Sequence, residues 1–232
     1  MIIDCISDLH GFYPKLDGGD LLIVGGDLTA TDTSDEYIKF DSWITCQHYK
    51  KIIVIAGNHD NFVQNNLEHF TRLLEISPPS KSVEYLQDSG TEFEGLKIWG
   101  MPWTTTFRGM NPRCKAFTKD SETELQDKVE MIPDDVDILI THGPAHHVLD
   151  KTVNGQEVGH GHLYGYLRYA IRPKLHVFGH IHEAYGYCEH FSGCISVNAS
   201  HVNERYEPVN KPIRIEIDGK SLFSKILGGL TS

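Results

Sequence analysis

The sequence of 232 residues predicts an α/β protein in which two mixed sheets pack face to face between outer helices, a four-layer α/β/β/α sandwich. Three observations lead to this prediction. The first third of the chain alternates short apolar runs with segments of helical periodicity. Two more helical segments flank a strand pattern in the middle of the chain, and only strand patterns follow residue 182. No repeat or linker divides the chain, so we expect a single domain over residues 1–232.

Five apolar runs predict buried strands, because parallel strands covered on both faces are continuously hydrophobic. In chain order they are Ile2–Ile6, Leu21–Val24, Ile52–Ile55, Ile138–Ile140 and Leu175–Phe178. A further strand is expected over 92–99, where apolar and polar residues alternate. Three strand patterns follow near the end of the chain, at Tyr185–Tyr187, Cys194–Val197 and Ile213–Ile217. Asp218 and Gly219 then predict a turn into a final short strand.

Four segments predict helices on the outer faces of the sheets. Their expected ranges are 34–48, 62–75, 121–130 and 160–171. Thr33 and Glu36 have the spacing of a capping box at the start of the first helix. Pro78 and Pro79 should stop the second helix. We expect Asp60 to cap that second helix rather than to act on a substrate.

The composition is that of a soluble globular protein, with 40% hydrophobic and 23% charged residues. A net charge of −11 argues against a stable nucleic-acid partner, since such proteins are usually basic. The apolar runs are too short to cross a bilayer, and the first residues lack the basic region of a secretory signal. Five cysteines form no C-x-x-C pair. We therefore expect a cytoplasmic protein without a membrane partner, and the oligomeric state stays open.

Residues that can bind metals follow each of the five buried strand patterns. Because the carboxyl ends of parallel strands lie along one edge of a sheet, these side chains should converge. The seven candidate ligands are Asp8, His10, Asp27, Asn58, His142, His180 and His182. Taken alone, each is equally well explained as a polar residue of a loop. Taken together, nitrogen and oxygen ligands without thiolates favour two divalent ions, with manganese first and iron, zinc or magnesium as alternatives. Asp27 is the expected bridge between ions ~3.5–4 Å apart.

Five short motifs carry a family resemblance. D-x-H, G-G-D, G-N-H-D, T-H-G and G-H-I-H, in this order, resemble the calcineurin-like metallophosphoesterase superfamily over nearly the whole chain. The resemblance implies the metallophosphoesterase fold and a division of the ligands between two ions. One ion would be held by Asp8, His10, Asp27 and His182, and the other by Asp27, Asn58, His142 and His180. It also implies that Asn58 and His59 contact the phosphate and that His59 protonates the leaving oxygen.

Four further segments resemble the metallophosphoesterase-domain (MPPED-like) branch of this superfamily. They are Tyr85–Ser89, Gly100–Thr104, Pro173–Gly179 and His182–Gly186. That branch is associated with metal-dependent phosphodiesterase activity and purine nucleotide binding. Some of its vertebrate members carry glycine at the position of His180, so this histidine implies a complete second metal site. The chain also lacks the G-D-x-x-D-R extension of the phosphoprotein phosphatases after Asp27, which favours a small diester.

We therefore expect a dinuclear-metal-dependent phosphoesterase that hydrolyses small phosphodiesters, of nucleotide or cyclic-nucleotide type, through a hydroxide that bridges the metals. Acid catalysis by His59 would contribute roughly 10²–10⁴-fold. Two alternatives stay open: a phosphomonoesterase on the same centre, and a nucleotide-binding protein with weak residual hydrolysis. Trp103 is a candidate for stacking on a base, although packing explains it at least as well. The role of the basic loop 104–120 is left open.

Overall fold

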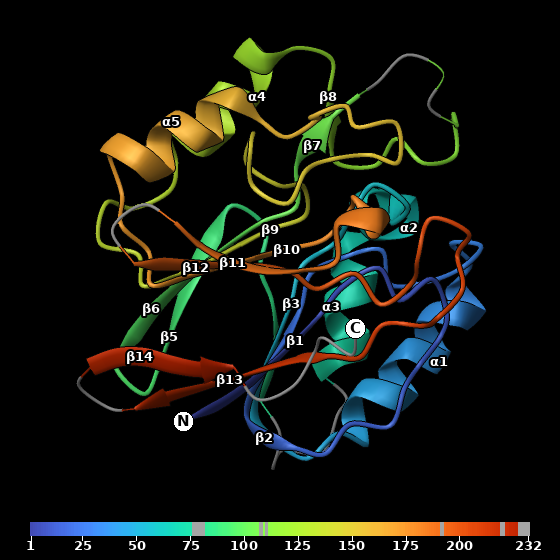
Figure 1. Cartoon of the computed structure of the whole chain (residues 1–232). Helices are drawn as coiled ribbons and strands as arrows, with labels where there is room; N and C mark the ends of the chain where they lie inside the picture. Colours follow the sequence, from blue (N-terminus) through green and yellow to red (C-terminus); the bar gives the residue numbers. More distant parts are fainter. Residues whose placement is uncertain (76–81, 107–108, 110, 191–192, 219–220, 227–232) are drawn as a thin grey trace.

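The structure is a computed structural model that describes the chain except for residues 76–81, 107–108, 110, 191–192, 219–220 and 227–232. It has the predicted sandwich of two mixed sheets between helices (Figure 1). Helices α1 (Ser34–Thr45) and α3 (Leu67–Glu75) cover the outer face of the first sheet. Helices α4 (Glu122–Val129) and α5 (Gly161–Tyr169) cover the outer face of the second. The predicted fold class is therefore confirmed.

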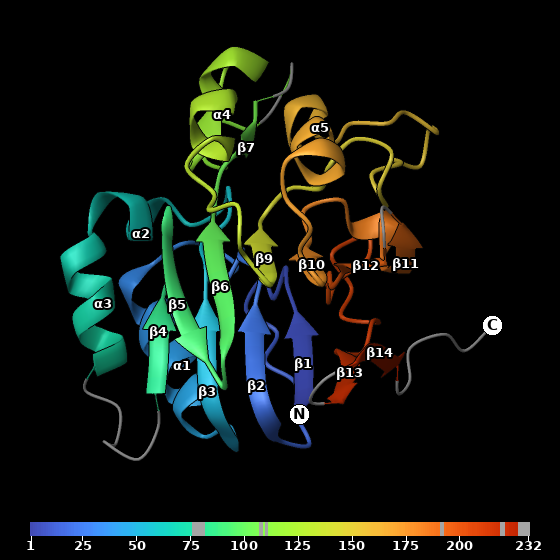
Figure 2. The ribbon, with the colours of Figure 1, turned by 90° about the vertical axis from the view of Figure 1, so that its left-hand side faces the viewer.

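The first sheet has six strands in the order β14-β13-β1-β2-β3-β4. Strands β1 to β4 are parallel, and β13 and β14 add an antiparallel hairpin at one side. Figure 2 shows the arrowheads of β1 and β2 at the same end of this sheet. The strands are β1 (Ile2–Ile6), β2 (Gly19–Val24), β3 (Tyr49–Val54), β4 (Ser82–Tyr85), β13 (Ile213–Asp218) and β14 (Ser221–Ile226).

The second sheet has the order β11-β12-β10-β9-β6-β5. Its four inner strands are parallel, and its two edge strands are antiparallel to their neighbours. The strands are β5 (Ser89–Phe93), β6 (Leu96–Met101), β9 (Ile138–Thr141), β10 (Leu175–Phe178), β11 (Gly186–His190) and β12 (Cys194–Asn198). Two short helical segments and a small pair of strands complete the described chain. They are α2 (Asn61–Asn65), the 3₁₀ turn η1 (His182–Ala184), β7 (Thr104–Thr105) and β8 (Thr118–Lys119).

The side chains of the parallel strands alternate between two buried layers. On β2, Leu21 and Ile23 face the second sheet and pack in one core with Ile138 and Val177. Leu22 and Val24, from the same strand, pack against α1 and α3. Burial on both faces explains why β2 and β3 contain unbroken apolar runs. None of the helices in the described part of the chain has the length and apolar character needed to cross a bilayer.

Two predicted elements are wrong in their extent. The strand expected over 92–99 is a hairpin, because Glu94 and Gly95 both have positive φ, of 49° and 80°, and turn β5 back onto β6. The helix expected over 62–75 is two helices, separated at Asn66. The backbone N–H and side-chain amide of Asn66 both donate to the carbonyl of Phe62 and end α2 there. The stop predicted at Pro78 and Pro79 lies outside the described residues, as does part of the turn at 218–219.

The predicted caps also differ. Thr33 is the N-cap of α1, but its side chain makes no capping hydrogen bond. Glu36 instead accepts hydrogen bonds from the backbone N–H and hydroxyl of Thr31, at 2.7 and 2.8 Å. Asp60 stands at the N-cap of α2 and likewise makes no capping bond, because its carboxylate accepts hydrogen bonds from other loops.

Strand β4, which pairs in parallel with β3, was not among the predicted elements.

Candidate metal centre

The seven predicted ligands lie on loops that leave the carboxyl ends of β1, β2, β3, β9 and β10. The backbone there is unusual. Asp8, His10, Asp27 and His180 have positive φ, of 51°, 42°, 53° and 68°. A left-handed conformation costs an L-residue roughly 1–2 kcal/mol. Strain of this kind, concentrated on four of the candidate ligands, is typical of a functional site.

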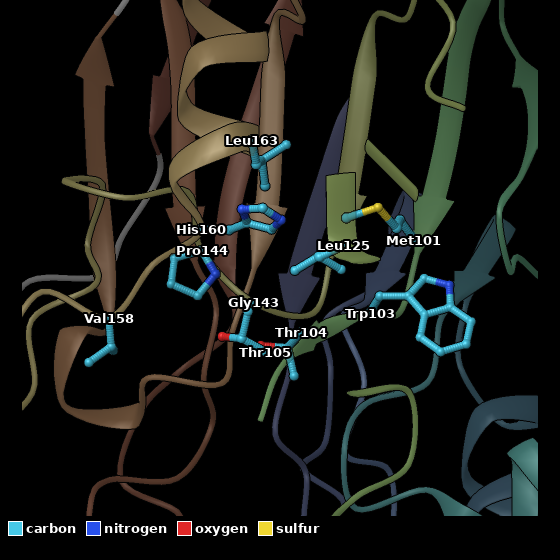
Figure 3. Close-up of a pocket in the computed structure, with 10 residues that line it drawn as sticks. All are labelled: Met101, Trp103, Thr104, Thr105, Leu125, Gly143, Pro144, Val158, His160 and Leu163. Atoms are coloured by element: carbon cyan, nitrogen blue, oxygen red, sulfur yellow. The ribbon is translucent and has the colours of Figure 1, made fainter. Parts of the chain in front are cut away.

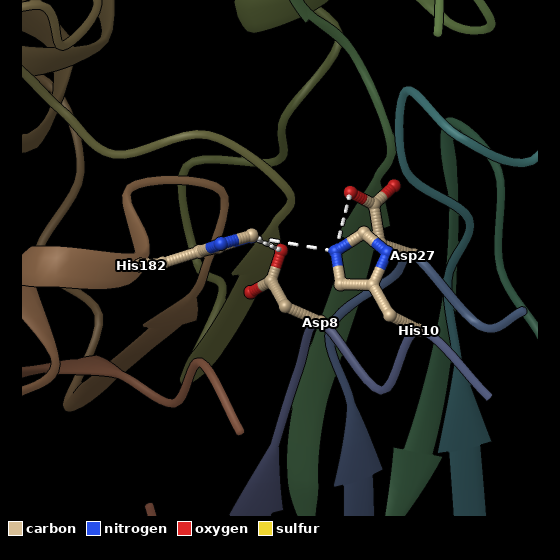
Figure 4. Close-up of side chains that lie close together, drawn as sticks. All are labelled: Asp8, His10, Asp27 and His182. Atoms are coloured by element: carbon tan, nitrogen blue, oxygen red, sulfur yellow. Dashed lines mark hydrogen bonds and ion pairs between the residues drawn. The ribbon is translucent and has the colours of Figure 1, made fainter. Parts of the chain in front are cut away.

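Four of the seven side chains form one buried group (Figure 4). Asp8, His10, Asp27 and His182 each offer a ligand atom, and these atoms lie within 4.8 Å of one another. Nε2 of His10 and Nε2 of His182 are 3.4 Å apart. A carboxylate oxygen flanks each ring nitrogen: Asp8 Oδ1 lies 3.3 Å from His182, and Asp27 Oδ2 lies 3.7 Å from His10. This donor set suits a divalent cation.

Asp27 faces two groups at once. Its Oδ2 is directed to His10 and lies 3.9 Å from Nε2 of His59. Its Oδ1 lies 3.4 Å from Nε2 of His142, on the other side. The carboxylate thus belongs to the buried group of four side chains and also faces a second group of candidate ligands around His142.

The second group contains two carbonyl-type oxygens and a ring nitrogen that accepts hydrogen bonds unless His142 is doubly protonated. Nδ1 of His142 lies 3.0 Å from the carbonyl oxygen of Gly25, so Nδ1 carries the proton in this contact. The amide nitrogen of Asn58 donates to the carbonyl of Cys114, which turns Asn58 Oδ1 towards His142 Nε2, 2.9 Å away. Nε2 of His142, Oδ1 of Asn58 and Oδ1 of Asp27 therefore converge. Three such atoms need a cation among them, either a proton on Nε2 or a metal ion.

His180 joins this second group through its ring, whose centroid is 5.1 Å from that of His142. Its backbone N–H donates to both oxygens of Asp8, at 3.1 and 3.0 Å. The loop can approach so closely because the preceding residue is Gly179. A Cβ at that position would lie 2.0 Å from Asp8 Oδ2. All seven predicted ligands are thus brought together.

Electrostatics at the centre favour the ionisation states of metal ligands at Asp8 and His10, and a protonated ring at His142 as long as no metal ion is bound. Burial alone would raise the pKa of Asp8, but contact with His182 holds it well below its usual range. Burial lowers the pKa of His10 to about 4, so its ring is neutral near pH 7. Burial disfavours the charged form of His142 as well, but the Asp27 carboxylate raises the pKa of His142 to about 9. A proton on His142 can thus serve as the cation of the second group, and a metal ion would displace it.

Two residues that were not predicted as ligands hold the carboxylates in place. Ser200 donates its hydroxyl to Asp8 Oδ2 at 2.8 Å. The carboxylate of Asp60, fully buried, accepts the backbone N–H groups of Asp27, Leu28 and Gly57 at 2.7–3.0 Å. It also accepts the hydroxyl of Tyr37. Sequence reasoning missed this role, because the position of Asp60 before a helix also fits a cap.

His59 and Trp103 were predicted to contact substrate. His59 stands at the edge of the centre, with 20% of its side chain exposed against 4% for His10 and none for His142. Its Nδ1 lies 3.5 Å from Sγ of Cys114.

Trp103 has a different environment. Its Nε1 donates to Asp88 at 2.8–2.9 Å, and the ammonium groups of Lys119 and Lys128 lie 4.7 and 4.6 Å from its ring. Its ring also packs edge-on against Phe117. These partners bear out packing as a role for Trp103, and its contact with substrate stays a prediction.

A small pocket of about 10 Å³ is lined in part by Gly143, which follows His142 (Figure 3). His160 points into it, and Nε2 of this buried ring has no hydrogen-bond partner in the described part of the protein. The volume suits about one water molecule. It is too small for a phosphate ester.

Comparisons with known proteins agree with this geometry. The family model described as calcineurin-like phosphoesterase matches residues 1–184. Metallophosphoesterase domain-containing protein 1 of Homo sapiens is 35% identical over 233 aligned positions, which cover 92% of this chain and 70% of that protein. UPF0046 protein T07D4.2 of Caenorhabditis elegans is 32% identical, and the match covers 92% of this chain and 59% of that protein.

Solved structures share the fold at low identity. One crystal structure superposes with a TM-score of 0.67 at 14% identity, and the match covers 92% of this chain and 93% of the other. TT1561 of Thermus thermophilus superposes with a TM-score of 0.61 at 15% identity, and the match covers 85% of this chain and 88% of the other. The family match and the sequence relatives, together with the buried Asp/His cluster, identify the chain as a hydrolase of the calcineurin-like phosphoesterase family.

Proposed function

We propose that this chain is a dinuclear-metal-dependent phosphodiesterase that hydrolyses small diesters of nucleotide type. The observation that carries the proposal is the placement of Asp27, whose two oxygens face two separate sets of nitrogen and oxygen ligands. A single ion would leave one of these sets unused. A bridging carboxylate is the arrangement that two-metal phosphoesterase chemistry needs.

The residues present fit two cations. Asp8, His10, Asp27 and His182 would hold one ion, since their ligand atoms already surround one point. Asp27, Asn58, His142 and His180 would hold the other, where Oδ1 of Asn58 and Oδ1 of Asp27 both lie near Nε2 of His142. A pair of divalent cations supplies a nucleophile at neutral pH and stabilises the attacking and leaving oxygens of an in-line displacement.

His59 lies where it could act as the acid that protonates the leaving oxygen. Its backbone N–H donates to Asp27 Oδ1 at 2.9 Å, which fixes the residue beside the centre. Its Nε2 lies 3.9 Å from Asp27 Oδ2, and its Nδ1 lies 3.5 Å from Sγ of Cys114. We propose that this partly exposed ring contacts the phosphate and gives a proton to the departing alkoxide.

Three finer assignments belong to the same proposal. Manganese is the preferred metal, because oxygen and imidazole donors suit it and no thiolate is present among the proposed ligands. A diester is preferred over a monoester, because Asp27 is not followed by the Asp and Arg of the phosphoprotein phosphatases. A cytoplasmic location fits five cysteines that are all unpaired.

The test combines metal content with turnover. Protein purified without chelator should contain about two divalent ions per chain, and added Mn²⁺ should support hydrolysis of bis(p-nitrophenyl) phosphate in preference to p-nitrophenyl phosphate. A reversed preference would assign the chain to the phosphomonoesterases. His180→Gly removes one ligand of the second ion without touching the first group. If wild type turned over no faster than His180→Gly, the chain would instead be a nucleotide-binding protein with residual hydrolysis.

A further inference from the structure

Tyr206 lies over the metal centre, although it stands far in sequence from every ligand motif. Its ring centroid is 4.8 Å from that of His10 and 5.1 Å from that of His182, with interplanar angles of 73° and 88°. The ring of His59 is 6.3 Å away. Tyr206 therefore meets two proposed metal ligands edge to face and lies near the proposed acid.

The backbone of Tyr206 is held in a conformation that an aromatic residue rarely adopts. Its φ is +60°, in the left-handed region. A tight turn enforces it: the side-chain oxygen of Asn203 accepts the backbone N–H groups of Arg205 and Glu207, and the carbonyl of Asn203 accepts the N–H of Tyr206. The turn positions the ring over the centre rather than in the core.

The ring is only half covered, since 49% of Tyr206 is exposed. A large apolar side chain in a strained conformation gains little from packing while half of it faces solvent. Exposed aromatic rings beside a phosphate site can instead stack on a base, an interaction that tolerates any base because each has a π-face. Trp103, the aromatic residue that the sequence suggested for this task, already has Asp88 and two lysines as partners.

We propose that Tyr206 is a specificity-determining residue that contacts the nucleobase of a substrate whose phosphate lies at the metal centre. This inference rests on the proposed function, because it takes the phosphate site from it. It deepens that proposal by naming the residue that selects the base of the nucleotide diester, which is the tyrosine ring and not the metal ligands.

The test compares two ligands that differ only in the base, adenosine 5′-monophosphate and ribose 5-phosphate. Each is titrated calorimetrically into protein loaded with Mn²⁺. Wild type should bind the nucleotide about tenfold more tightly or better. In Tyr206→Leu the ratio of the two dissociation constants should fall to about one. Binding of ribose 5-phosphate and the metal content should stay unchanged. Tyr206→Phe keeps the ring and should keep the ratio.

Two further variants make the result decisive. Tyr206→Asn also removes the ring and suits a positive φ, so it replaces Tyr206→Leu if that variant does not fold. Val209→Ala, at a 61% exposed position of the same loop, should leave the ratio at its wild-type value. An unchanged ratio in the ring-free variants overturns the inference, and so does an equal loss of affinity for both ligands, because the ring would then support the centre and not the base.

Failure of the inference and failure of the proposed function are separable. Binding is measured without turnover, and hydrolysis of bis(p-nitrophenyl) phosphate is measured on the same protein. A chain that shows the base-dependent ratio but no hydrolysis refutes the function alone. A chain that hydrolyses the diester with a ratio insensitive to Tyr206 refutes the inference alone.

Discussion

The carboxylate of Asp60 accepts the backbone N–H of Asp27 at 2.9 Å, so one buried acid fixes the loop that presents another to the metal centre. The same carboxylate accepts the N–H of Leu28 at 3.0 Å and that of Gly57 at 2.7 Å, and thereby ties the loops after β2 and β3 together. All three of these partners are donors. The geometry of Asp27, the proposed bridge, therefore depends on a residue outside both sets of candidate ligands.

Asp60→Asn tests this dependence. The amide would turn an N–H group towards one of the buried donors, and an unsatisfied or opposed buried group costs about 1–3 kcal/mol. We expect a loss of that size in the free energy of unfolding by urea and a weaker affinity for Mn²⁺ in calorimetric titration. Asp17→Asn, at an exposed position, is the matched control and should change neither. Wild-type Mn²⁺ affinity in Asp60→Asn would show that the loops hold Asp27 without it.

His59→Ala tests the proposed acid. The ring lies beside the centre but is not needed to complete either set of ligands. We expect turnover of bis(p-nitrophenyl) phosphate to fall by about 10²–10⁴-fold while the metal content measured by mass spectrometry is retained. The control is His48→Ala, which removes an exposed imidazole. If metal and turnover were lost together, His59 would be a structural residue of the centre.

Cys114 contacts the other side of that imidazole. Burial raises the pKa of the Cys114 thiol, so the group stays protonated near pH 7 and is a weak partner for Nδ1 of His59, 3.5 Å away. Removing the partner in Cys114→Ala should lower kcat about fivefold, equivalent to roughly 1 kcal/mol, with KM unchanged. Cys114→Ser restores a hydrogen-bonding group and should recover most of kcat. A change in KM alone would place the effect on substrate binding instead.

Gly57 tests how tightly the second group is packed. A Cβ at this position would lie 2.2 Å from Asp27 Oδ1 and 2.5 Å from Cε1 of His142, so one of the two must move. We expect Gly57→Ala to lower the free energy of unfolding by about 1–3 kcal/mol and to weaken Mn²⁺ binding. Gly165→Ala in α5 meets no atom within 4 Å and should stabilise the chain by up to about 1 kcal/mol. Equal stability of the two variants would contradict this crowding around Gly57.

The convergence of the seven candidate ligands was predictable because two simple rules apply to it. Apolar runs mark parallel strands, and polar residues directly after such strands share one edge of the sheet. The same reasoning could not find Tyr206. Its position over His10 depends on a left-handed turn closed by Asn203, and the sequence pattern does not predict a positive φ for a tyrosine. It also misjudged Asp60, because a carboxylate before a helix fits both a cap and a clamp between loops. The distinction depends on tertiary contacts with the loops after β2 and β3, which no local pattern encodes.

His176 on β10 gives a pH dependence that is independent of the metal ligands. Thr141 donates its hydroxyl to the carbonyl of Gly143 at 2.7 Å, so the contact between Thr141 Oγ1 and His176 Nε2, at 2.9 Å, requires the proton on Nε2. Nδ1 is then a buried nitrogen without a partner among the described residues. Burial lowers the pKa of His176 to about 3, below the value near 6.5 expected for an unfolded chain.

The sign of the effect follows directly. Above about pH 6.5 the ring is neutral in both states, and its contribution to stability is complete. As the pH falls from 6.5 towards 3, the His176 ring binds a proton in the unfolded chain but stays neutral in the folded chain. The free energy of unfolding therefore decreases. The free energy of unfolding is measured in urea at pH 7 and pH 5, with chelator present throughout. Its decrease from pH 7 to pH 5 should be about 2 kcal/mol smaller in His176→Gln than in wild type. His48→Gln, which removes an exposed imidazole, should keep the wild-type loss. Equal losses in wild type and His176→Gln would mean that the folded protein accommodates a charged His176.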